Sequence, residues 1–113
     1  MSEYLFLYRG AGPSGSPEQM QLVMQKWVAW FRDLGAKGHI KSPGHPLERA
    51  GKVVKGAGKA VHDGPFAEAK DVVGGYTLIE ARDLDQAVEL SKGYPVLERD
   101  GSVEVRPIQK IDM

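Results

Sequence analysis

The sequence predicts a single α+β domain in which two helices cover one face of an antiparallel sheet. Two segments show the three- and four-residue apolar spacing of amphipathic helices, each with a capping residue at its start. Short runs rich in aromatic and β-branched residues precede, separate and follow these helices. The length of 113 residues suffices for one hydrophobic core, and no linker or repeat divides the chain. Residues 1–113 are therefore expected to form one domain.

The first third of the chain is expected to form a strand and then a long helix. The strand is the apolar run 4–8, which a glycine-rich segment ends. Ser16 is suited to cap the helix, Pro17 fits its first position, and Gln19 completes a capping box. The apolar stripe of this helix, which Gly35 should stop, comprises Met20, Val23, Met24, Trp27, Trp30, Phe31 and Leu34. Because both tryptophans lie on that stripe, we expect them to pack in the core.

Shorter elements fill the rest of the chain. They are a strand at 38–41, a hairpin of strands 52–55 and 59–63, a strand at 75–81, a helix that Asp83 caps and Gly93 closes, and a last strand at 103–108. The order is β-α-β, a hairpin, then β-α-β. It is typical of a ferredoxin-like antiparallel sheet with both helices on one face.

Two of the predicted strands are apolar on both faces. The run 4–8 sets three aromatic residues against two leucines, and the strand at 75–81 alternates two apolar sets in the same way. Two helices cover only one face of the sheet, so the other face needs a second cover. A second copy of the same sheet is the simplest one, and we therefore expect a homodimer.

Composition and charge exclude several classes of protein. Lysine and arginine together number 15, as do aspartate and glutamate, so the basic excess of a nucleic-acid-binding protein is missing. Without cysteine there is no disulfide, thiol nucleophile or thiolate metal site, and His39, His45 and His62 do not match a zinc spacing. We expect no metal and no cofactor. No apolar run is long enough to cross a membrane, so a cytoplasmic protein without membrane partners is expected.

Three motifs resemble the YCII-related family, and specifically its DGPF branch. They are Asp63-Gly64-Pro65-Phe66-Ala67-Glu68-Ala69-Lys70-Asp71, Gly74-Gly75-Tyr76 and Val103-Glu104-Val105-Arg106-Pro107-Ile108. The resemblance spans nearly the whole chain. It implies a ferredoxin-like fold that pairs into a dimeric α/β barrel. It implies no settled activity, because the DGPF branch has none.

The resemblance does not supply a catalytic pair. Related YCII proteins have been proposed to be enzymes with a histidine on the first helix and an aspartate in an Asp-Pro-aromatic motif after the second. Here the helix 17–34 contains no histidine, and the matching stretch reads Gly93-Tyr94-Pro95, without a carboxylate. Any catalysis must use other residues. DGPF proteins also tend to be linked to transcription initiation, but the neutral net charge gives no support for direct contact with nucleic acid.

The segment 63–71 gathers the polar candidates Asp63, Glu68 and Lys70 around a Gly-Pro turn. In one interpretation these side chains bind a small polar ligand, and Asp63 or His62 acts as the acid or base. In the other, Asp63 accepts backbone hydrogen bonds and fixes the turn. Adjacent strand residues point to opposite faces, so His62 and Asp63 form a dyad only where the strand bends. His39 is expected to be solvated.

Glu104 and Arg106 share one face of the last strand. If Val103 and Val105 face the helices, these two charges point into the dimer barrel. In one alternative they form an internal or intersubunit ion pair. In the other, Arg106 binds an anionic ligand such as a carboxylate.

Two functions remain open. In the first, the chain is a homodimeric module that binds a small anionic or polar ligand or has a regulatory role. The missing His–Asp pair favours this function. In the second, the chain is a small acid–base enzyme that acts on an organic acid or an oxygenated metabolite in the dimer barrel, which the polar segment 63–71 favours.

Overall fold

The computed structural model describes residues 1–10, 15–64, 72–99 and 101–111. The elements in chain order are β1 (Ser2–Arg9), α1 (Pro17–Ala36), β2 (Ile40–Ser42), β3 (Gly51–Lys55), β4 (Ala60–Gly64), β5 (Val73–Ala81), α2 (Leu84–Ser91), the 3₁₀ helix η2 (Pro95–Arg99) and β6 (Ser102–Pro107). Each strand and helix expected from the sequence is present, with bounds shifted by no more than two residues. The short helix η2 was not expected.

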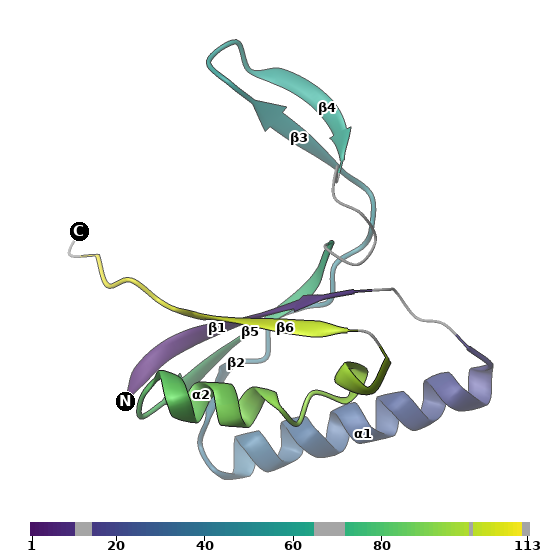
Figure 1. Ribbon diagram of the computed structural model, residues 1–113, viewed down its shortest axis with the longest axis vertical. Helices are drawn as coiled ribbons and strands as arrows, with labels where there is room; N and C mark the ends of the chain where they lie inside the picture. The colour runs from purple at the N-terminus through teal and green to yellow at the C-terminus, as the bar shows by residue number, and fades with distance from the viewer. Residues whose placement is uncertain (11–14, 65–71, 100, 112–113) are drawn as a thin grey trace.

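The sheet has four strands in the order β2-β5-β1-β6, and every neighbouring pair is antiparallel. This is the arrangement expected for a ferredoxin-like α+β fold. Strands β3 and β4 form a separate two-stranded hairpin. Figure 1 shows both helices on one side of the sheet and the hairpin standing off on the other side. We call the face without helices the open face.

Helix α1 begins as predicted and ends later than predicted. The Ser16 hydroxyl accepts from the Gln19 N–H at 3.1 Å, and the Gln19 side chain accepts from the Ser16 N–H at 3.0 Å. The helix continues through Gly35, and the left-handed residue that ends it is Gly38, with φ of 78°. The Gly38 N–H bonds the Gly35 carbonyl and the His39 N–H bonds the Leu34 carbonyl, a Schellman motif.

The core lies between the sheet and the helices. Its buried apolar side chains are Tyr4, Phe6, Tyr8, Trp30, Leu34, Ile79, Ala81, Ala87 and Tyr94. Trp30 stacks on Phe6 with ring centroids 6.2 Å apart, and its indole N–H donates to the Leu90 carbonyl at 3.1 Å. Trp30 therefore lies in the core, as its position on the apolar stripe predicted, and it joins α1 to both the sheet and α2. Trp27 is only partly buried.

His39 is buried, so the expectation that it is solvated is wrong. The residue precedes β2, and its backbone carbonyl accepts from the Glu80 N–H of β5 at 2.8 Å. Its ring Nδ1–H donates to the Glu80 carbonyl, also at 2.8 Å. Because a carbonyl only accepts, the proton is on Nδ1. His39 fixes the edge of the sheet, a contact between residues 41 positions apart that the local pattern did not indicate.

The open face has a half-buried apolar centre. Leu5 of β1 lies opposite Leu78 of β5, and Leu7 lies opposite Tyr76. All four side chains are partly exposed, whereas the alternate residues of the same strands are buried under the helices. Both faces of β1 and β5 are therefore apolar, as the sequence indicated.

Asp83 caps α2 and makes the stability of the protein depend on pH. The backbone N–H of Gln86 donates to the Asp83 carboxylate at 2.8 Å, and this hydrogen bond lowers the pKa of the carboxyl. A lowered pKa in the folded state stabilises the fold above the unfolded-state pKa, and that contribution is lost as pH falls through the folded-state pKa. We expect the melting temperature of Asp83→Asn to fall less than that of the wild type between neutral pH and about pH 3. An equal fall in both proteins would contradict this role.

Candidate functional site

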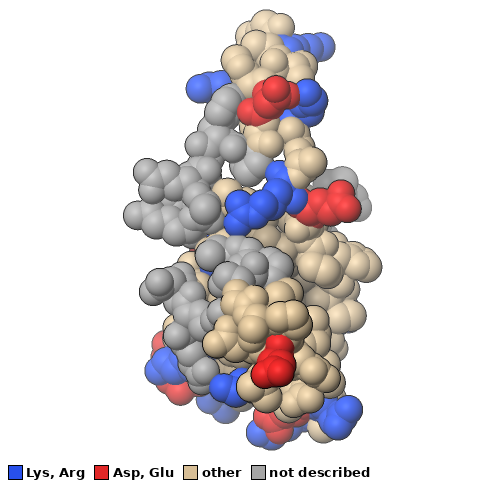
Figure 2. All heavy atoms as spheres, turned by 90° about the vertical axis from the view of Figure 1, so that its right-hand side faces the viewer, with Lys and Arg blue, Asp and Glu red and all other residues tan. Residues whose placement is uncertain are grey.

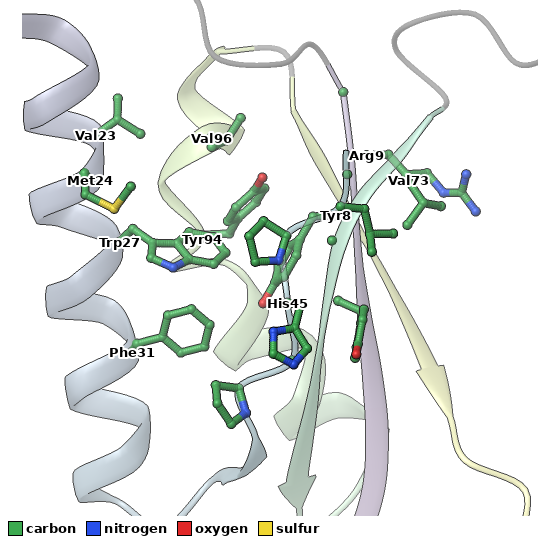
Figure 3. A pocket seen from close by; sticks show the side chains of 18 of the residues that line it. Tyr8, Arg9, Val23, Met24, Trp27, Phe31, His45, Val73, Tyr94 and Val96 are labelled. Carbon is green, nitrogen blue, oxygen red and sulfur yellow. The ribbon is translucent and has the colours of Figure 1, made fainter. Parts of the chain in front are cut away.

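A cavity of about 1110 Å³ opens between helix α1 and the edge of the sheet. Such a volume accommodates a ligand of drug-like size. One wall is α1, the floor is formed by the ends of β1 and β5, and the opposite wall is the segment 43–49, which follows β2. Figure 3 shows how side chains from these elements converge on the cavity.

The interior of the cavity is largely aromatic. Trp27 is at the centre, with ring centroids 5.0 Å from Tyr8, 5.2 Å from Tyr94 and 4.8 Å from Phe31. All three contacts are close to edge-on, and Tyr8 and Tyr94 lie 4.7 Å apart. Val23 and Met24 extend this surface along α1. Clustered ring faces and edges favour a flat, apolar ligand.

A chain of hydrogen bonds links the floor to the wall. The Tyr8 hydroxyl donates to Thr77 Oγ1 at 2.7 Å, and the Thr77 hydroxyl donates to the Pro43 carbonyl at 3.0 Å. Burial raises the pKa of Tyr8 far above its ordinary value and outweighs the opposing effect of the Thr77 hydrogen bond. Burial raises the pKa of Tyr94 as well. Both phenols are therefore neutral at physiological pH and do not repel an anion.

The wall segment is held tightly against β5. The Leu47 N–H donates to the Gly74 carbonyl at 2.8 Å, and the Tyr76 N–H donates to the His45 carbonyl at 3.3 Å. Gly44 has a φ of 69°, and a Cβ on it would lie 1.9 Å from the Tyr76 carbonyl oxygen. Only glycine fits this close approach. The Pro- and Gly-rich loop is thus fixed against β5, where it forms one wall of the cavity.

The rim of the cavity carries charged side chains. Arg32 of α1 and Arg49 and Glu48 of the wall line it, together with the His45 ring, which lies 6.3 Å from the Tyr76 ring. Within the described part of the chain, neither Arg32 nor Arg49 forms an ion pair. Arg9 also borders the cavity, but its side chain points away from it, as Figure 3 shows. The rim therefore has an excess of positive charge beside an apolar interior.

Two sequence candidates lie on the hairpin and not at the cavity. Asp63 belongs to β4, its side chain is 89% exposed, and it forms an ion pair with Lys52 of β3. His62 precedes it and is also exposed. Glu68 and Lys70, with the rest of the segment 65–71, lie outside the described residues. The structure therefore does not bring Asp63 or His62 to the aromatic cavity within one chain.

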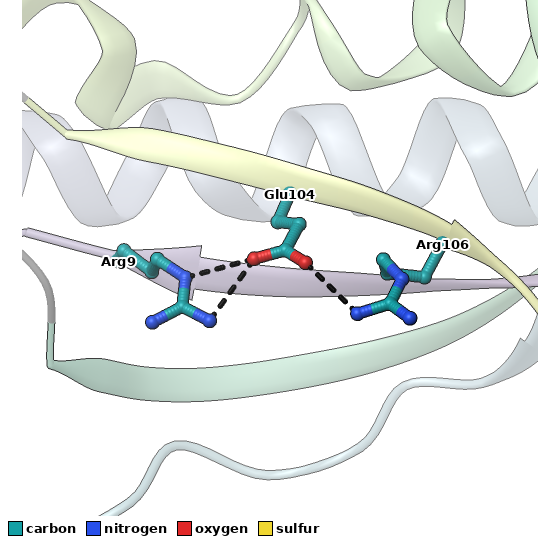
Figure 4. A network of polar contacts seen from close by, with 3 residues as sticks. All are labelled: Arg9, Glu104 and Arg106. Atoms are coloured by element: carbon teal, nitrogen blue, oxygen red, sulfur yellow. Dashed lines mark hydrogen bonds and ion pairs between the residues drawn. The ribbon is translucent and has the colours of Figure 1, made fainter.

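The other two candidates, Glu104 and Arg106, lie on the open face beside Arg9. Val103 and Val105 pack toward the core, which places the alternate residues on the opposite side. Glu104 accepts from Arg9 at 3.0 Å and from Arg106 at 3.2 Å, as Figure 4 shows. The hydrogen bonds from Arg106 and Arg9 lower the pKa of the Glu104 carboxyl. The ion pair between Glu104 and Arg106, one of the two alternatives from the sequence, is present, and Arg9 is a third member that was not expected.

The residues that sequence reasoning missed are those of the aromatic cavity. Trp27 packs against the core, as its place on the helical stripe predicted, but it also lines the cavity, which the stripe did not indicate. The signal that could have found the wall is the loop Ser42-Pro43-Gly44-His45-Pro46, which is compact, rich in Pro and Gly, and contains a histidine. Periodicity reports which face of a helix is apolar, but not whether that face is fully covered.

The described residues also limit other kinds of site. In the ranges that the structure describes, no group of three or more His, Asp or Glu side chains is placed to hold a metal ion. No described helix has the length and apolar character needed to cross a membrane.

Comparison with known proteins places the chain in a family. One similar solved structure is the 5-chloro-2-hydroxyhydroquinone dehydrochlorinase TftG from Burkholderia phenoliruptrix AC1100, in complex with 2,5-dihydroxybenzoquinone. It is 20% identical, the match covers 95% of this chain and 93% of that chain, and the TM-score is 0.49. The model of the YCII-related domain matches residues 4–112. The chain therefore belongs to the YCII-related family.

Proposed function

We propose that this protein is a homodimeric ligand-binding module whose cavity takes a small aromatic anion. The observation that carries the proposal is the combination of an aromatic interior with two arginines at the rim, Arg32 and Arg49. Trp27 and Phe31 offer surfaces for a flat ring, and a guanidinium group favours a carboxylate. Membership of the DGPF branch within the family stays a prediction.

The proposed dimer buries the open face. Leu5, Leu7, Leu78 and Tyr76 form a contiguous apolar patch that the helices of the same chain do not cover. Face-to-face pairing of two sheets removes both patches from water, and the driving force grows with the apolar area that is buried. In this dimer, Glu104 and Arg106 lie between the sheets, and the aromatic cavities lie on the outer, helical sides.

Ligand binding is tested with 1-naphthoate and its uncharged counterpart, 1-naphthalenemethanol. We expect 1-naphthoate to bind at least about tenfold more tightly, because only the carboxylate gains a charge-assisted hydrogen bond from the rim. Arg32→Gln and Arg49→Gln should each weaken 1-naphthoate binding and leave 1-naphthalenemethanol binding unchanged. The measurement is isothermal titration calorimetry.

The matched control for these variants is Arg82→Gln, which removes an exposed arginine remote from the cavity. It should leave both affinities unchanged. Equal affinity of the two probes for the wild type would rule out an anion site at this rim. If neither probe binds, the cavity is not a site for aromatic ligands.

An acid–base enzyme is the second candidate, and His45 is the observation that favours it. Its imidazole lies on the cavity wall, and histidine is the commonest general acid or base. Asp63 and His62 could take part only with a ligand outside this cavity or one held by the partner subunit. The test compares two single variants, Asp63→Asn and His45→Asn, and measures the turnover of an aromatic acid by each. Turnover lost in His45→Asn alone would place the chemistry at the cavity, and no turnover in the wild type would reject the enzyme.

A further inference from the structure

Two polar groups of the aromatic interior have no hydrogen-bond partner in the part of the chain that the structure describes. They are the indole N–H of Trp27 and the hydroxyl of Tyr94. The neighbouring Trp30 differs, because its indole N–H donates to the Leu90 carbonyl at 3.1 Å. The aromatic interior therefore combines rings whose polar atoms are satisfied within the fold with two donors that are not.

Both donors open to the cavity. Tyr94 is only 8% exposed, yet every side-chain nitrogen or oxygen of the described residues that is shut off from solvent has a hydrogen-bond partner. The Tyr94 hydroxyl therefore contacts solvent, and the same holds for the Trp27 indole N–H. Both residues line the cavity, and Figure 3 shows their rings beside each other. The solvent that they contact is therefore that of the cavity.

The two donors are held in place by the fold. The Tyr94 N–H donates to the Ser91 carbonyl at 3.0 Å, and the Tyr94 carbonyl accepts from the Leu97 N–H at 3.2 Å. The Trp27 ring packs edge-on against Phe31 with centroids 4.8 Å apart, and against Tyr94 with centroids 5.2 Å apart. A polar group that the scaffold already positions gives a pocket specificity at little cost in conformational entropy.

We propose that the ligand is an oxo-substituted aromatic acid, whose ring carbonyl accepts hydrogen bonds from both Trp27 and Tyr94. This inference rests on the proposed aromatic anion site and adds the substituent of the ring. A carbonyl oxygen has two lone pairs, which match two donors, and it brings no proton that needs an acceptor. A ring without an acceptor displaces the water that satisfies these donors and leaves them unpaired, which costs affinity.

The test compares acids that differ only in one carbonyl group. The 4-, 5- and 6-carboxylates of 1-oxoindane each have a matched indane carboxylate, in which a CH₂ group replaces the carbonyl. The site fixes the distance between carboxylate and carbonyl, so we expect at least one oxo acid to bind about tenfold or more tightly than its match. Isothermal titration calorimetry on the full chain measures each affinity.

The comparison cancels attraction to other cationic side chains. The hairpin of β3 and β4 carries three lysines, and Figure 2 shows basic side chains at this end of the molecule, at its top. Both acids of a pair have the same charge, so these lysines affect both affinities alike. A difference within a pair therefore reports the carbonyl and not the charge.

Tyr94→Phe removes the hydroxyl and keeps the ring. The oxo acid should then bind within about threefold of its match, because one of its two donors is lost, while the affinity of the matched acid should not fall. The control is Tyr4→Phe, which removes the hydroxyl of a buried tyrosine of β1 that does not line the cavity. This variant should keep the full advantage of the oxo acid.

The wild-type protein gives a second measurement that does not depend on how a variant folds. A hydrogen bond moves the resonance of its proton downfield, so the oxo acid should shift the Trp27 indole proton downfield relative to the matched acid. An equal shift with both acids of each pair would contradict the part that Trp27 has in the inference.

The outcomes separate this inference from the proposed function. Matched acids that bind and lose affinity in Arg32→Gln, without any gain from a carbonyl, overturn this inference and leave the anion site intact. A gain that persists undiminished in Tyr94→Phe also overturns it. If no acid of either series binds, the proposed function and this inference fail together.

Discussion

Replacing Gly44 by alanine is expected to lower the free energy of unfolding by about 3 kcal/mol or more. Two costs add in this variant. A residue with a Cβ is strained at a φ of 69°, by about 1–2 kcal/mol, and overpacking typically adds about 1–3 kcal/mol. The new Cβ would lie 1.9 Å from the Tyr76 carbonyl oxygen and 2.8 Å from its carbon, so the wall must move away from β5. Denaturant unfolding measures the loss, and 1-naphthoate binding should weaken with it.

Gly38 supplies the control because it shares the backbone conformation without the contact. Its φ is 78°, and a Cβ there would meet nothing within 4 Å. Gly38→Ala should therefore cost only the backbone strain, about 1–2 kcal/mol, and leave 1-naphthoate binding unchanged. Similar losses in the two variants would show that the wall does not press on β5.

Thr77→Val is expected to lower the free energy of unfolding by about 2–3 kcal/mol. Valine has nearly the same shape, but it removes the acceptor of the Tyr8 hydroxyl and the donor to the Pro43 carbonyl. The buried Tyr8 hydroxyl and the partly exposed Pro43 carbonyl then lose a partner, and an unsatisfied buried group costs about 1–3 kcal/mol, less where water reaches it. Since this chain of hydrogen bonds joins the floor of the cavity to its wall, 1-naphthoate binding should weaken in parallel.

Thr77→Ser is the matched variant. Serine keeps both hydrogen bonds and removes one buried methyl group, which is worth about 1 kcal/mol. It should retain 1-naphthoate binding close to that of the wild type. Equal losses of stability and affinity for valine and serine would mean that the hydroxyl of Thr77 contributes nothing to the cavity.

The elements of the fold could be predicted because their signals are local. The Ser16 and Gln19 capping box and the Asp83 cap each lie within four residues of the backbone that they satisfy, so the sequence shows them directly. The end of α1 was displaced because two glycines, Gly35 and Gly38, compete for one role. Only the backbone conformation shows that Gly38 takes it.

The candidate site could not be predicted in the same way, because its contacts are distant in sequence. Arg9 and Glu104 are 95 residues apart, and Tyr8 and Thr77 are 69 apart. Trp27 and Trp30 lie on the same apolar stripe, yet Trp30 is buried in the core and Trp27 lines the cavity. What separates them is the position of the wall segment, which depends on its hydrogen bonds with β5.

The central claim, that the aromatic cavity binds a small anion, is tested most directly by the two indole N–H resonances of the protein. The chain has two tryptophans, and a ¹⁵N-labelled sample shows one indole signal for each. Trp27 lines the cavity, whereas the Trp30 indole is held by the Leu90 carbonyl. Titration with 1-naphthoate is expected to move the Trp27 signal to saturation while the Trp30 signal moves much less. A Trp27 signal that stays still, or that moves without saturating, would contradict the account.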